Sequence, residues 1–419
     1  MRFTGLKYLQ LLACLGLFAC GSAERYGVVI VGGGASGTAA GLQAARMGAR
    51  TLIVEEFDWL GGMLTSAGVS ATDGNYRLRG GIWDEFRTEL ARHYGCDSAL
   101  ITGWVSNVMF EPSVGDSIFK RLVAREPNLT VWYRSAAETA ERGKDVWRLG
   151  VRRDGRLRQG EAGVLVDATE LGDVARMAGV PYDVGMDSSA VTHEDIAPAE
   201  ANGIVQDLTY VAVLKDYGRD VTIPRPDGYD PSLFACCCVN DLCIAPKEPH
   251  RMWSREMMIT YGKLPDGKYM INWPIEGNDY YVDMIDMTPE ERADAVRRAK
   301  NHTLSFVYFL QHELGFNTLG LADDEFPTED RLPFIPYHRE SRRIHGVVRF
   351  TLNDITDPYA GTLYRTAVGV GDYPVDQHHT RYSGWDPEVS NNLDPRFMGV
   401  DNFSVPQPRM FCFGLNVTF

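Results

Sequence analysis

Apolar positions near the start of the chain follow a strand, turn, helix and strand pattern. A continuous run at residues 27–31 passes through glycines into an alanine-rich stretch at 38–47, which predicts a buried strand, a tight turn and a helix. Gly48 marks a helix stop, and residues 51–54 form a second apolar run of strand length. Buried strands separated by a helix predict an α/β domain.

A hairpin and a further strand are predicted after this unit. Residues 146–153 and 156–158 flank Asp154 and Gly155, which together are a hairpin turn signal. Residues 163–166 are apolar and β-branched, and we expect them to form a separate strand.

A long helix is predicted from residue 289. Residues 288–291 form a capping box with proline at the first helical position. Apolar residues then recur at helical spacing, which indicates a scaffold helix. They are Ala293, Val296, Leu304, Val307, Leu310 and Leu314.

The N-terminus has the order of an export signal. Arg2 and Lys7 precede an apolar run at 8–18 that is too short to span a bilayer comfortably. The residues that end in Cys20 resemble the bacterial lipobox, in which the chain is cut before the cysteine and the thiol is acylated. This predicts residues 1–19 as a signal peptide and Cys20 as the site of a lipid anchor.

A plain secretory signal is the alternative, and in either case we expect the mature chain to be exported. It would then be an outer-membrane-anchored lipoprotein or a periplasmic protein. Loss of residues 1–19 removes two positive charges and no acid, so the net charge of −14 becomes −16. This charge, with no run of Lys or Arg, argues against nucleic acid as a partner.

Three glycines after the first predicted strand have dinucleotide-binding spacing. Gly32, Gly34 and Gly37 form GxGxxG, in which the first allows the turn, the second lets a pyrophosphate approach, and the third permits close packing. Ser36 lies inside the motif. Glu55 follows the second strand, where an acid binds the ribose hydroxyls. The alternative is a glycine turn that binds nothing.

Two later segments favour FAD over NAD. Gly61 and Gly62 resemble the glycine pair of two-dinucleotide flavoproteins, and residues 167–173 resemble a second flavin contact. The candidate cofactor residues in this second segment are Asp167, Thr169, Gly172 and Asp173. An ordinary strand-to-loop connection is the alternative for residues 167–173. No second GxGxxG follows, so an NAD(P)H site is not visible.

Residues 26–379 resemble the secreted bacterial FAD-dependent oxidoreductases grouped with heterodisulfide reductase-like flavoproteins, some of which are labelled xanthan lyase. The segments that carry the likeness are 31–41, 60–64, 167–173, 339–343 and 371–376 with His378 and His379. The resemblance implies a Rossmann-like FAD-binding domain, made of residues 20–183 and 338–379. An α+β substrate domain at 184–337 would be inserted between these two parts.

The resemblance also implies where the chemistry takes place. Arg342 lies in a matching segment and could hold a flavin phosphate or a substrate carboxylate; a surface ion-pair cluster around Glu340 is the alternative. Asp372 is a further cofactor candidate. Three residues of the same stretch could move the proton that accompanies hydride transfer. They are Tyr373, His378 and His379.

Four cysteines cluster in the middle of the chain, at Cys236, Cys237, Cys238 and Cys243. The family grouping implies a 4Fe-4S iron–sulfur cluster here. The spacing is not C-x₂-C-x₂-C, and an exported chain is a poor place for a thiolate cluster. We therefore expect a disulfide, or small buried thiols, and no metal.

The last forty residues depart from the family pattern. Residues 411–419 alternate apolar and polar side chains, as a lipid-facing barrel strand does, and resemble the end of TonB-dependent outer-membrane receptors. We interpret 380–419 as a tail from a fused or frame-disrupted gene, with the FAD domain left incomplete and FAD held weakly or not at all. An amphipathic strand pairing within the flavoprotein is the alternative.

The leading functional prediction is an exported, lipid-anchored FAD-dependent oxidoreductase with a small-molecule or glycan-derived substrate. A second is a flavoprotein remnant with weak or no FAD binding. A third, from the family's label, is a polysaccharide-degrading enzyme. Aromatic residues of the middle region, such as Tyr261, Trp273 and Tyr280, could line a sugar or ring pocket, but packing is the expected role of most of them.

Overall fold

A computed structural model describes residues 24–74, 76–247, 249, 252–357, 359–366, 378 and 381. The signal peptide, Cys20, Asp372, Tyr373 and His379 lie outside the described residues, and so does the tail at 380–419 apart from Arg381. The predictions made for them stay predictions.

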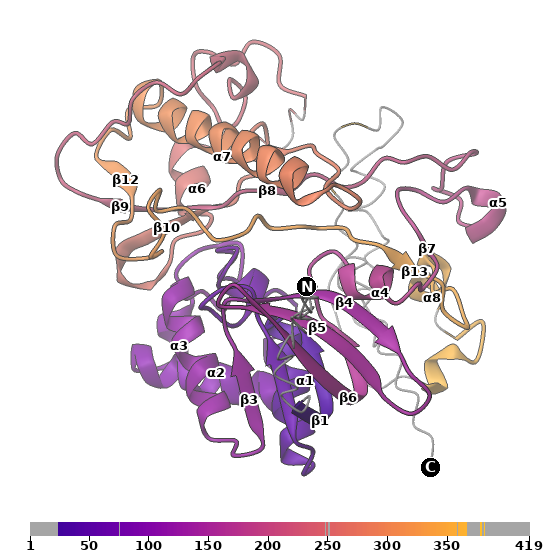
Figure 1. The fold of residues 1–419 in the computed structure, drawn as a ribbon. Helices are drawn as coiled ribbons and strands as arrows, with labels where there is room; N and C mark the ends of the chain where they lie inside the picture. The colour runs from indigo at the N-terminus through magenta and orange to yellow at the C-terminus, as the bar shows by residue number, and fades with distance from the viewer. Residues whose placement is uncertain are drawn as a thin grey trace, which may run out of the picture.

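A six-stranded sheet forms the lower half of the molecule in Figure 1. The central strand β1 pairs in parallel with β2 on one side and with β6 on the other, and β2 pairs in parallel with β3. Strands β4 and β5 complete the sheet through antiparallel pairing. In sheet order the strands are β3 (Leu129–Trp132), β2 (Thr51–Val54), β1 (Glu24–Val31), β6 (Arg156–Asp167), β5 (Trp147–Arg153) and β4 (Ser135–Arg142). The predicted α/β class is confirmed.

Strand β6 is longer than the sequence pattern predicts. The hairpin around Asp154 and Gly155 is present, but the separate strand expected at 163–166 is the continuation of the hairpin arm. Residues 156–162 pair with β5, and residues 160–167 pair with β1. A partner strand is therefore available along the whole length, and the chain has no reason to break between the two apolar stretches.

Three helices pack on one another beside the sheet. Helix α1 (Ala35–Arg46) contacts β1 and β2, and α3 (Pro112–Ala124) contacts both α1 and α2 (Gly81–Tyr94). Figure 1 shows α2 and α3 to the left of the sheet. Their shared hydrophobic core includes Leu42, Leu60, Phe86, Leu90, Phe110 and Phe119.

A second domain lies above the sheet in Figure 1. Its small antiparallel sheet has the order β10 (Lys268–Ile271), β9 (Ala212–Asp216) and β12 (Leu319–Leu321). The long helix α7 (Pro289–His312) crosses it and begins at the predicted capping box, which is confirmed. Helix α6 (Arg255–Thr260) packs against β10. The core between these elements is built mainly from large side chains, among them Tyr210, Phe234, Trp273, Phe306 and Phe309.

Short elements connect the two domains. Strand β13 (Arg343–Ile344) pairs antiparallel with β7 (Tyr182–Asp183), where the chain returns from the second domain to the first. Strand β8 (Leu208–Thr209) pairs with β11 (Asp279–Tyr280). The other short elements are α4 (Asp173–Met177), α5 (Ser189–Thr192), α8 (Leu352–Thr356), η1 (Gly62–Leu64), η2 (Asp97–Leu100), η3 (Pro231–Leu233), η5 (Pro265–Gly267) and η6 (Leu363–Thr366).

A buried polar cluster lies where α2 and α3 meet the second domain. Glu111, which precedes α3, is only 3% exposed and accepts a hydrogen bond from the Tyr94 hydroxyl. Glu325 of the second domain accepts from the Ser113 amide at 2.7 Å and pairs with the Lys268 ammonium at 2.7 Å. Burial raises the pKa of Glu111 to about 7. Its carboxyl group therefore titrates near neutral pH, beside the contact that Ser113 makes with Glu325 between the domains.

Replacing Glu111 with Gln should remove a pH dependence of stability. Since the folded-state pKa lies above the ordinary 4.5, the folded state binds the proton more tightly, and stability falls as pH rises from about 4.5 through 7. Between pH 5 and 8 the free energy of unfolding of the wild type should fall by on the order of 3 kcal/mol. Glu111→Gln should not show this decrease. Urea unfolding of both proteins at each pH measures this difference. The exposed Glu200→Gln is the control, and equal slopes in all three proteins would contradict the prediction.

Candidate functional site

The first glycine turn joins β1 to α1 with very close backbone packing. Gly32 has φ +100°, and a Cβ there would lie 2.2 Å from the carbonyl oxygen of Ala168. A Cβ on Gly37 would lie 2.0 Å from the carbonyl oxygen of Gly32. A Cβ on Gly34 would meet nothing closer than 3.7 Å. Packing therefore requires glycine at 32 and 37, whereas Gly34 leaves bare backbone for a ligand to approach.

The second glycine pair lies directly against the first turn. The Gly61 amide donates to the Gly33 carbonyl at 2.8 Å, and a Cβ on Gly62 would lie 2.8 Å from the Cα of Gly34. Helix α1 starts at this point, and Gly34, its N-cap residue, has no side chain to cap the first amides. Ser36 lies in this first turn and is partly exposed. We call the facing backbones of residues 32–37 and 61–62 the glycine cradle.

The glycine cradle fits the pyrophosphate of a dinucleotide. A side chain at Gly62 would fill the space beside Gly34, so the two glycines leave backbone that a phosphate can approach. The amides and dipole at the start of a twelve-residue helix favour a negatively charged group there. The residues predicted for FAD binding in this part of the chain are therefore brought together.

Glu55 lies at the end of β2, beneath the first glycine turn. It is 8% exposed, and its carboxylate accepts from the amides of Gly33 at 2.6 Å and Phe57 at 2.9 Å. Burial, with smaller contributions from neighbouring acids, raises its pKa to about 8. Its expected role at the ribose stays a prediction; in this structure its carboxylate fixes the turn.

The third predicted cofactor segment is a tightly hydrogen-bonded turn after β6. Asp167 accepts from the amide and hydroxyl of Thr169, at 2.9 and 2.6 Å, and from the Ala175 amide at 2.7 Å. The Thr169 hydroxyl in turn accepts from the Asp173 amide at 2.9 Å. Gly172, at φ +71°, is the N-cap residue of α4. Asp167 and Thr169 thus shape the loop that faces the first glycine turn.

Asp173 is held by two arginines from distant parts of the chain. Arg292, in the first turn of α7, binds both carboxylate oxygens at 2.7 and 2.8 Å, and Arg342 binds one at 2.8 Å. Burial acts to raise the pKa of Asp173, but the two guanidinium groups outweigh it and lower the pKa. Asp173 is therefore ionised at neutral pH and clamps the second domain to the first.

The arginine cluster at 339–343 forms ion pairs, as the alternative expected, but it is largely buried and not at the surface. Arg339 and Arg342 are each 4% exposed and Glu340 is 9% exposed. Arg342 also donates to the Leu171 carbonyl at 2.7 Å and to Asp286 at 2.7 Å. Its Nε atom is buried with no hydrogen-bond partner among the described residues. Whether it also touches a cofactor stays a prediction.

His378 is paired with an acid that sequence inspection did not identify. Its Nδ1 lies 2.6 Å from Oδ2 of Asp279, and the other carboxylate oxygen, Oδ1, lies 3.1 Å from the Arg339 guanidinium. The backbone of His378 is fixed on both sides, because its carbonyl accepts from the Asp207 amide at 2.8 Å and its amide donates to the Gln206 side chain at 3.1 Å. No local signal marks Asp279, which is 99 residues away in sequence.

The Asp279 carboxylate is suited to stabilise a charged imidazole. Its side chain is 5% exposed, and burial alone would raise its pKa. The charges of Arg339 and His378 and a hydrogen bond from Thr209 outweigh burial, so the pKa lies below its ordinary range. Asp279 therefore stays ionised at neutral pH and orients the ring through Nδ1.

One short segment links this histidine pair to the cofactor loop. Arg339 contacts Asp279, Glu340 accepts from the Gln206 amide at 3.0 Å, and Arg342 contacts Asp173. These three side chains lie within four residues of chain. The glycine cradle, its neighbouring loop and the His378–Asp279 pair therefore belong to one connected region.

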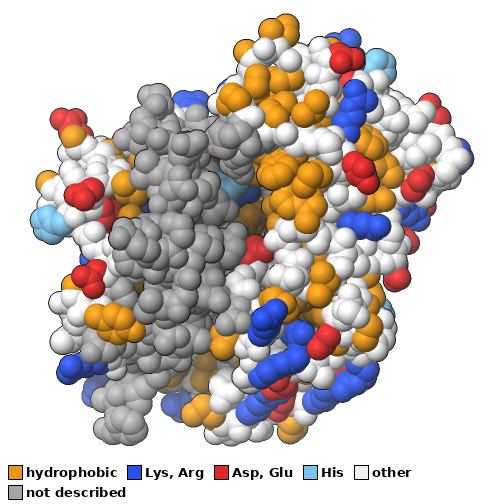
Figure 2. Space-filling model, turned by 180° about the vertical axis from the view of Figure 1, so that it is seen from behind, with side chains coloured by type: hydrophobic (Ala, Val, Ile, Leu, Met, Phe, Trp, Pro, Cys, Tyr) orange, Lys and Arg blue, Asp and Glu red, His pale blue; other side chains and the backbone are white. Residues whose placement is uncertain are grey.

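The cysteine cluster forms a disulfide between Cys236 and Cys243, one of the expected alternatives, whereas Cys237 and Cys238 are buried free thiols. In the described part of the chain, no three His, Cys, Asp or Glu side chains are arranged to hold a metal ion. Figure 2 shows hydrophobic side chains gathered on the upper lobe. Close in sequence to the disulfide, four hydrophobic side chains are exposed. They are Leu233, Val239, Leu242 and Ile244.

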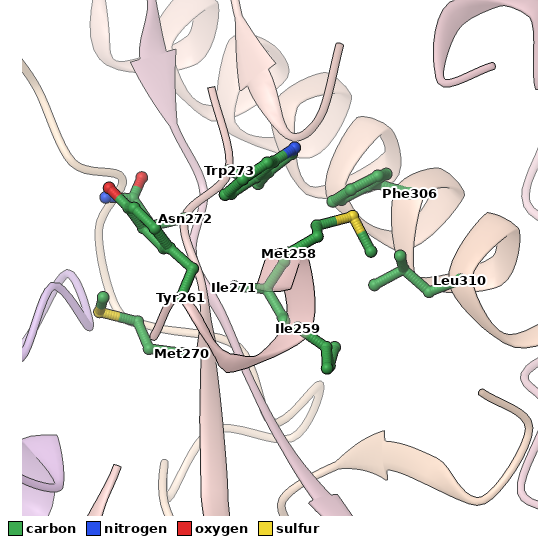
Figure 3. Close-up of a pocket in the computed structure, with 9 residues that line it drawn as sticks. All are labelled: Met258, Ile259, Tyr261, Met270, Ile271, Asn272, Trp273, Phe306 and Leu310. Carbon is green, nitrogen blue, oxygen red and sulfur yellow. The ribbon is translucent and has the colours of Figure 1, made fainter. Parts of the chain in front are cut away.

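A small pocket lies between α6, β10 and α7 (Figure 3). Tyr261, Asn272 and Trp273 lie on one side of it, and Phe306 and Leu310 of α7 lie on the other. Its free space holds about one water molecule, so it is not a flavin or sugar site. Trp273 is buried, and its indole N–H donates to the Cys237 carbonyl at 2.8 Å, which confirms packing as its role.

None of the helices in the described ranges combines the length and apolar content that a membrane span requires. A search of curated protein sequences gave no significant match.

Three solved structures that resemble this fold are oxidoreductases by name, at low similarity. The p-nitrophenol 4-monooxygenase PnpA from Pseudomonas putida DLL-E4 is 13% identical, with TM-score 0.34, over 78% of this chain and 70% of that chain. The aromatic hydroxylase CabE is 11% identical, with TM-score 0.35, over 65% and 48%. L-proline dehydrogenase from P. horikoshii is 19% identical, with TM-score 0.24, over 36% of this chain and only 24% of its own length. Likenesses at this level carry no argument about activity.

The family comparison covers most of the chain. Residues 27–410 match the model of the family described as FAD dependent oxidoreductase, and the match runs on through residues 380–410 of the segment interpreted above as a tail. The finer subfamily, with its heterodisulfide reductase and xanthan lyase labels, is not distinguished by this match. The chain therefore belongs to the FAD-dependent oxidoreductase family, and FAD is its cofactor.

Proposed function

We propose that this oxidoreductase is an exported, lipid-anchored member of the heterodisulfide reductase-like group that oxidises or reduces a small-molecule or glycan-derived substrate. His378 is the residue that exchanges the proton accompanying hydride transfer. The observation that carries this proposal is the His378–Asp279 pair at 2.6 Å, joined through residues 339–342 to the loop beside the glycine cradle.

In this proposal some residues bind the cofactor and others exchange a proton. When bound, FAD supplies the two-electron chemistry by accepting or delivering a hydride. The glycine cradle and the start of α1 would hold its phosphates, and Glu55 would bind the ribose hydroxyls. Because Nδ1 of His378 is committed to Asp279, the proton is exchanged at Nε2. Arg339 keeps Asp279 ionised, which favours the charged imidazole.

The disulfide supports the proposed export. Disulfides persist in extracytoplasmic compartments, where thiols are not kept reduced. The Cys236–Cys243 bond therefore agrees with the export signal at residues 1–19 and the anchor proposed at Cys20.

Gly34→Ala should weaken FAD binding without unfolding the protein. The new methyl group would meet no atom closer than 3.7 Å, so the fold tolerates it, but it would lie on the face that a pyrophosphate approaches. We expect FAD affinity to fall by at least about tenfold, as measured by quenching of FAD fluorescence on titration with protein.

Gly160→Ala in β6 is the matched control, since its Cβ would meet nothing closer than 4.0 Å. It should bind FAD like the wild type. If the wild type shows no saturable FAD binding, the remnant interpretation holds and the proposed oxidoreductase activity of this chain fails.

His378→Gln should slow flavin reduction while leaving FAD bound. An anaerobic screen of sugars, sugar acids and small aromatic compounds, read as loss of flavin absorbance, identifies a substrate. With that substrate the reduction rate should fall on the order of 10²- to 10⁴-fold, because the proton carrier is lost.

Asp279→Asn should lower the same rate through loss of ring orientation, with circular dichroism used to show that the fold is kept. His312→Gln, at the exposed end of α7, is the control and should react like the wild type. Equal rates in His378→Gln and the wild type would exclude His378 as the proton carrier. Release of unsaturated products from acidic polysaccharides, without flavin reduction, would favour the lyase interpretation instead.

A further inference from the structure

We propose that Glu170 is an intramolecular competitor for the phosphate position in the glycine cradle and that it weakens FAD binding. The inference rests on the proposed use of this cradle for the FAD pyrophosphate. Glu170 would then set how tightly this chain binds FAD.

The Glu170 carboxylate lies at both glycines of the cradle. Its Oε1 atom is 3.0 Å from the position that a Cβ on Gly62 would take and 3.7 Å from the position of a Cβ on Gly34. Among the described residues beyond its own chain neighbours and helix backbone, the other atom that a Gly34 Cβ would find within 4 Å is the Cα of Gly62. Glu170 is therefore the side chain that comes closest to the bare face of Gly34.

The same position is next to the start of helix α1. The point at which a Gly62 Cβ would stand is 3.7 Å from the amide nitrogen of Ala35, the first residue of the helix. A carboxylate there gains from the helix dipole in the same way as a phosphate group. The feature that attracts the cofactor therefore also attracts Glu170.

The backbone of the loop that contains Glu170 is fixed on both sides, so the loop cannot easily move away from the glycine cradle. Thr169 is fixed on one side by Asp167, and Gly172 and Asp173 are fixed on the other by α4 and the two arginines. The Glu170 side chain is partly exposed and can rotate, so it leaves the two glycines by rotation of its own side chain. A bound pyrophosphate must displace the carboxylate and then tolerate a nearby like charge.

This arrangement makes FAD a cofactor that exchanges. A negative charge beside the pyrophosphate opposes binding most strongly at low ionic strength, since salt screens the repulsion. Occupancy of the site would then follow the supply of FAD. The effect is confined to the phosphates, and groups without phosphate should not feel it.

The test compares Glu170→Gln with the wild-type chain in FAD titrations followed by fluorescence quenching. We expect Glu170→Gln to bind FAD on the order of tenfold more tightly at low salt, and the advantage should shrink as salt is raised. ADP should compete better for the variant, whereas adenosine should compete equally for both proteins. Glu170→Asp, which keeps the charge, should stay nearer the wild type.

Asp154→Asn is the charge-matched control. It removes one acid at the β5–β6 turn, where φ is +49° and Asn is well tolerated, and it should leave FAD affinity unchanged. If wild type and Glu170→Gln bind FAD equally, the inference fails and the cofactor site stands. Weaker binding by Glu170→Gln also overturns it, since the carboxylate would then help to hold FAD. If no variant binds FAD or ADP, the use of the cradle for FAD fails as well.

Discussion

The parallel register between β1 and β6 is the constraint on which the site depends. Val31 is opposite Asp167, so the chain leaves the two strands at the same level. The carbonyl of Ala168 then lies so close to Gly32 that no side chain fits between them. This contact places the glycine turn against the loop at 167–173 before any cofactor is considered. The position of Glu170 in the cradle is a further consequence of the same register.

Buried charge fixes the second domain on this sheet. Asp173 accepts hydrogen bonds from Arg292 of α7 and from Arg342, which lies in a later segment of the chain. Removing Asp173 would take one carboxylate from the buried Arg342 guanidinium, which would keep Asp286 as its other ion-pair partner. Through Arg342 the same network reaches the segment that holds Asp279 and His378. Cofactor loop and histidine pair are therefore positioned together, and a shift in one is transmitted to the other.

The features that could be predicted from sequence are those encoded by neighbouring residues. Glycine spacing in 32–37, the acid at 55 and the capping box before α7 are local patterns, and the structure contains each of them. The unbroken length of β6 depends on partners in two other strands, and Asp279 meets His378 across 99 residues. Neither leaves a local trace, because side-chain pairing between distant segments is decided by the register of the fold.

Weak FAD binding could have two separate causes, one at the flavin ring and one at the phosphates. The interpretation of residues 380–419 as a foreign tail, which the family match through residue 410 does not support, concerns the groups expected around the flavin ring. Glu170 concerns the phosphates that the glycine cradle would hold. These effects are physically independent, because one is a loss of contacts and the other is competition and charge repulsion. Their free energies would add, and only the second depends on salt. If the affinity of the wild-type chain for FAD rises toward a limit as salt increases, the salt-dependent part is the contribution of Glu170. The part that does not change with salt would include any missing contacts to the flavin ring.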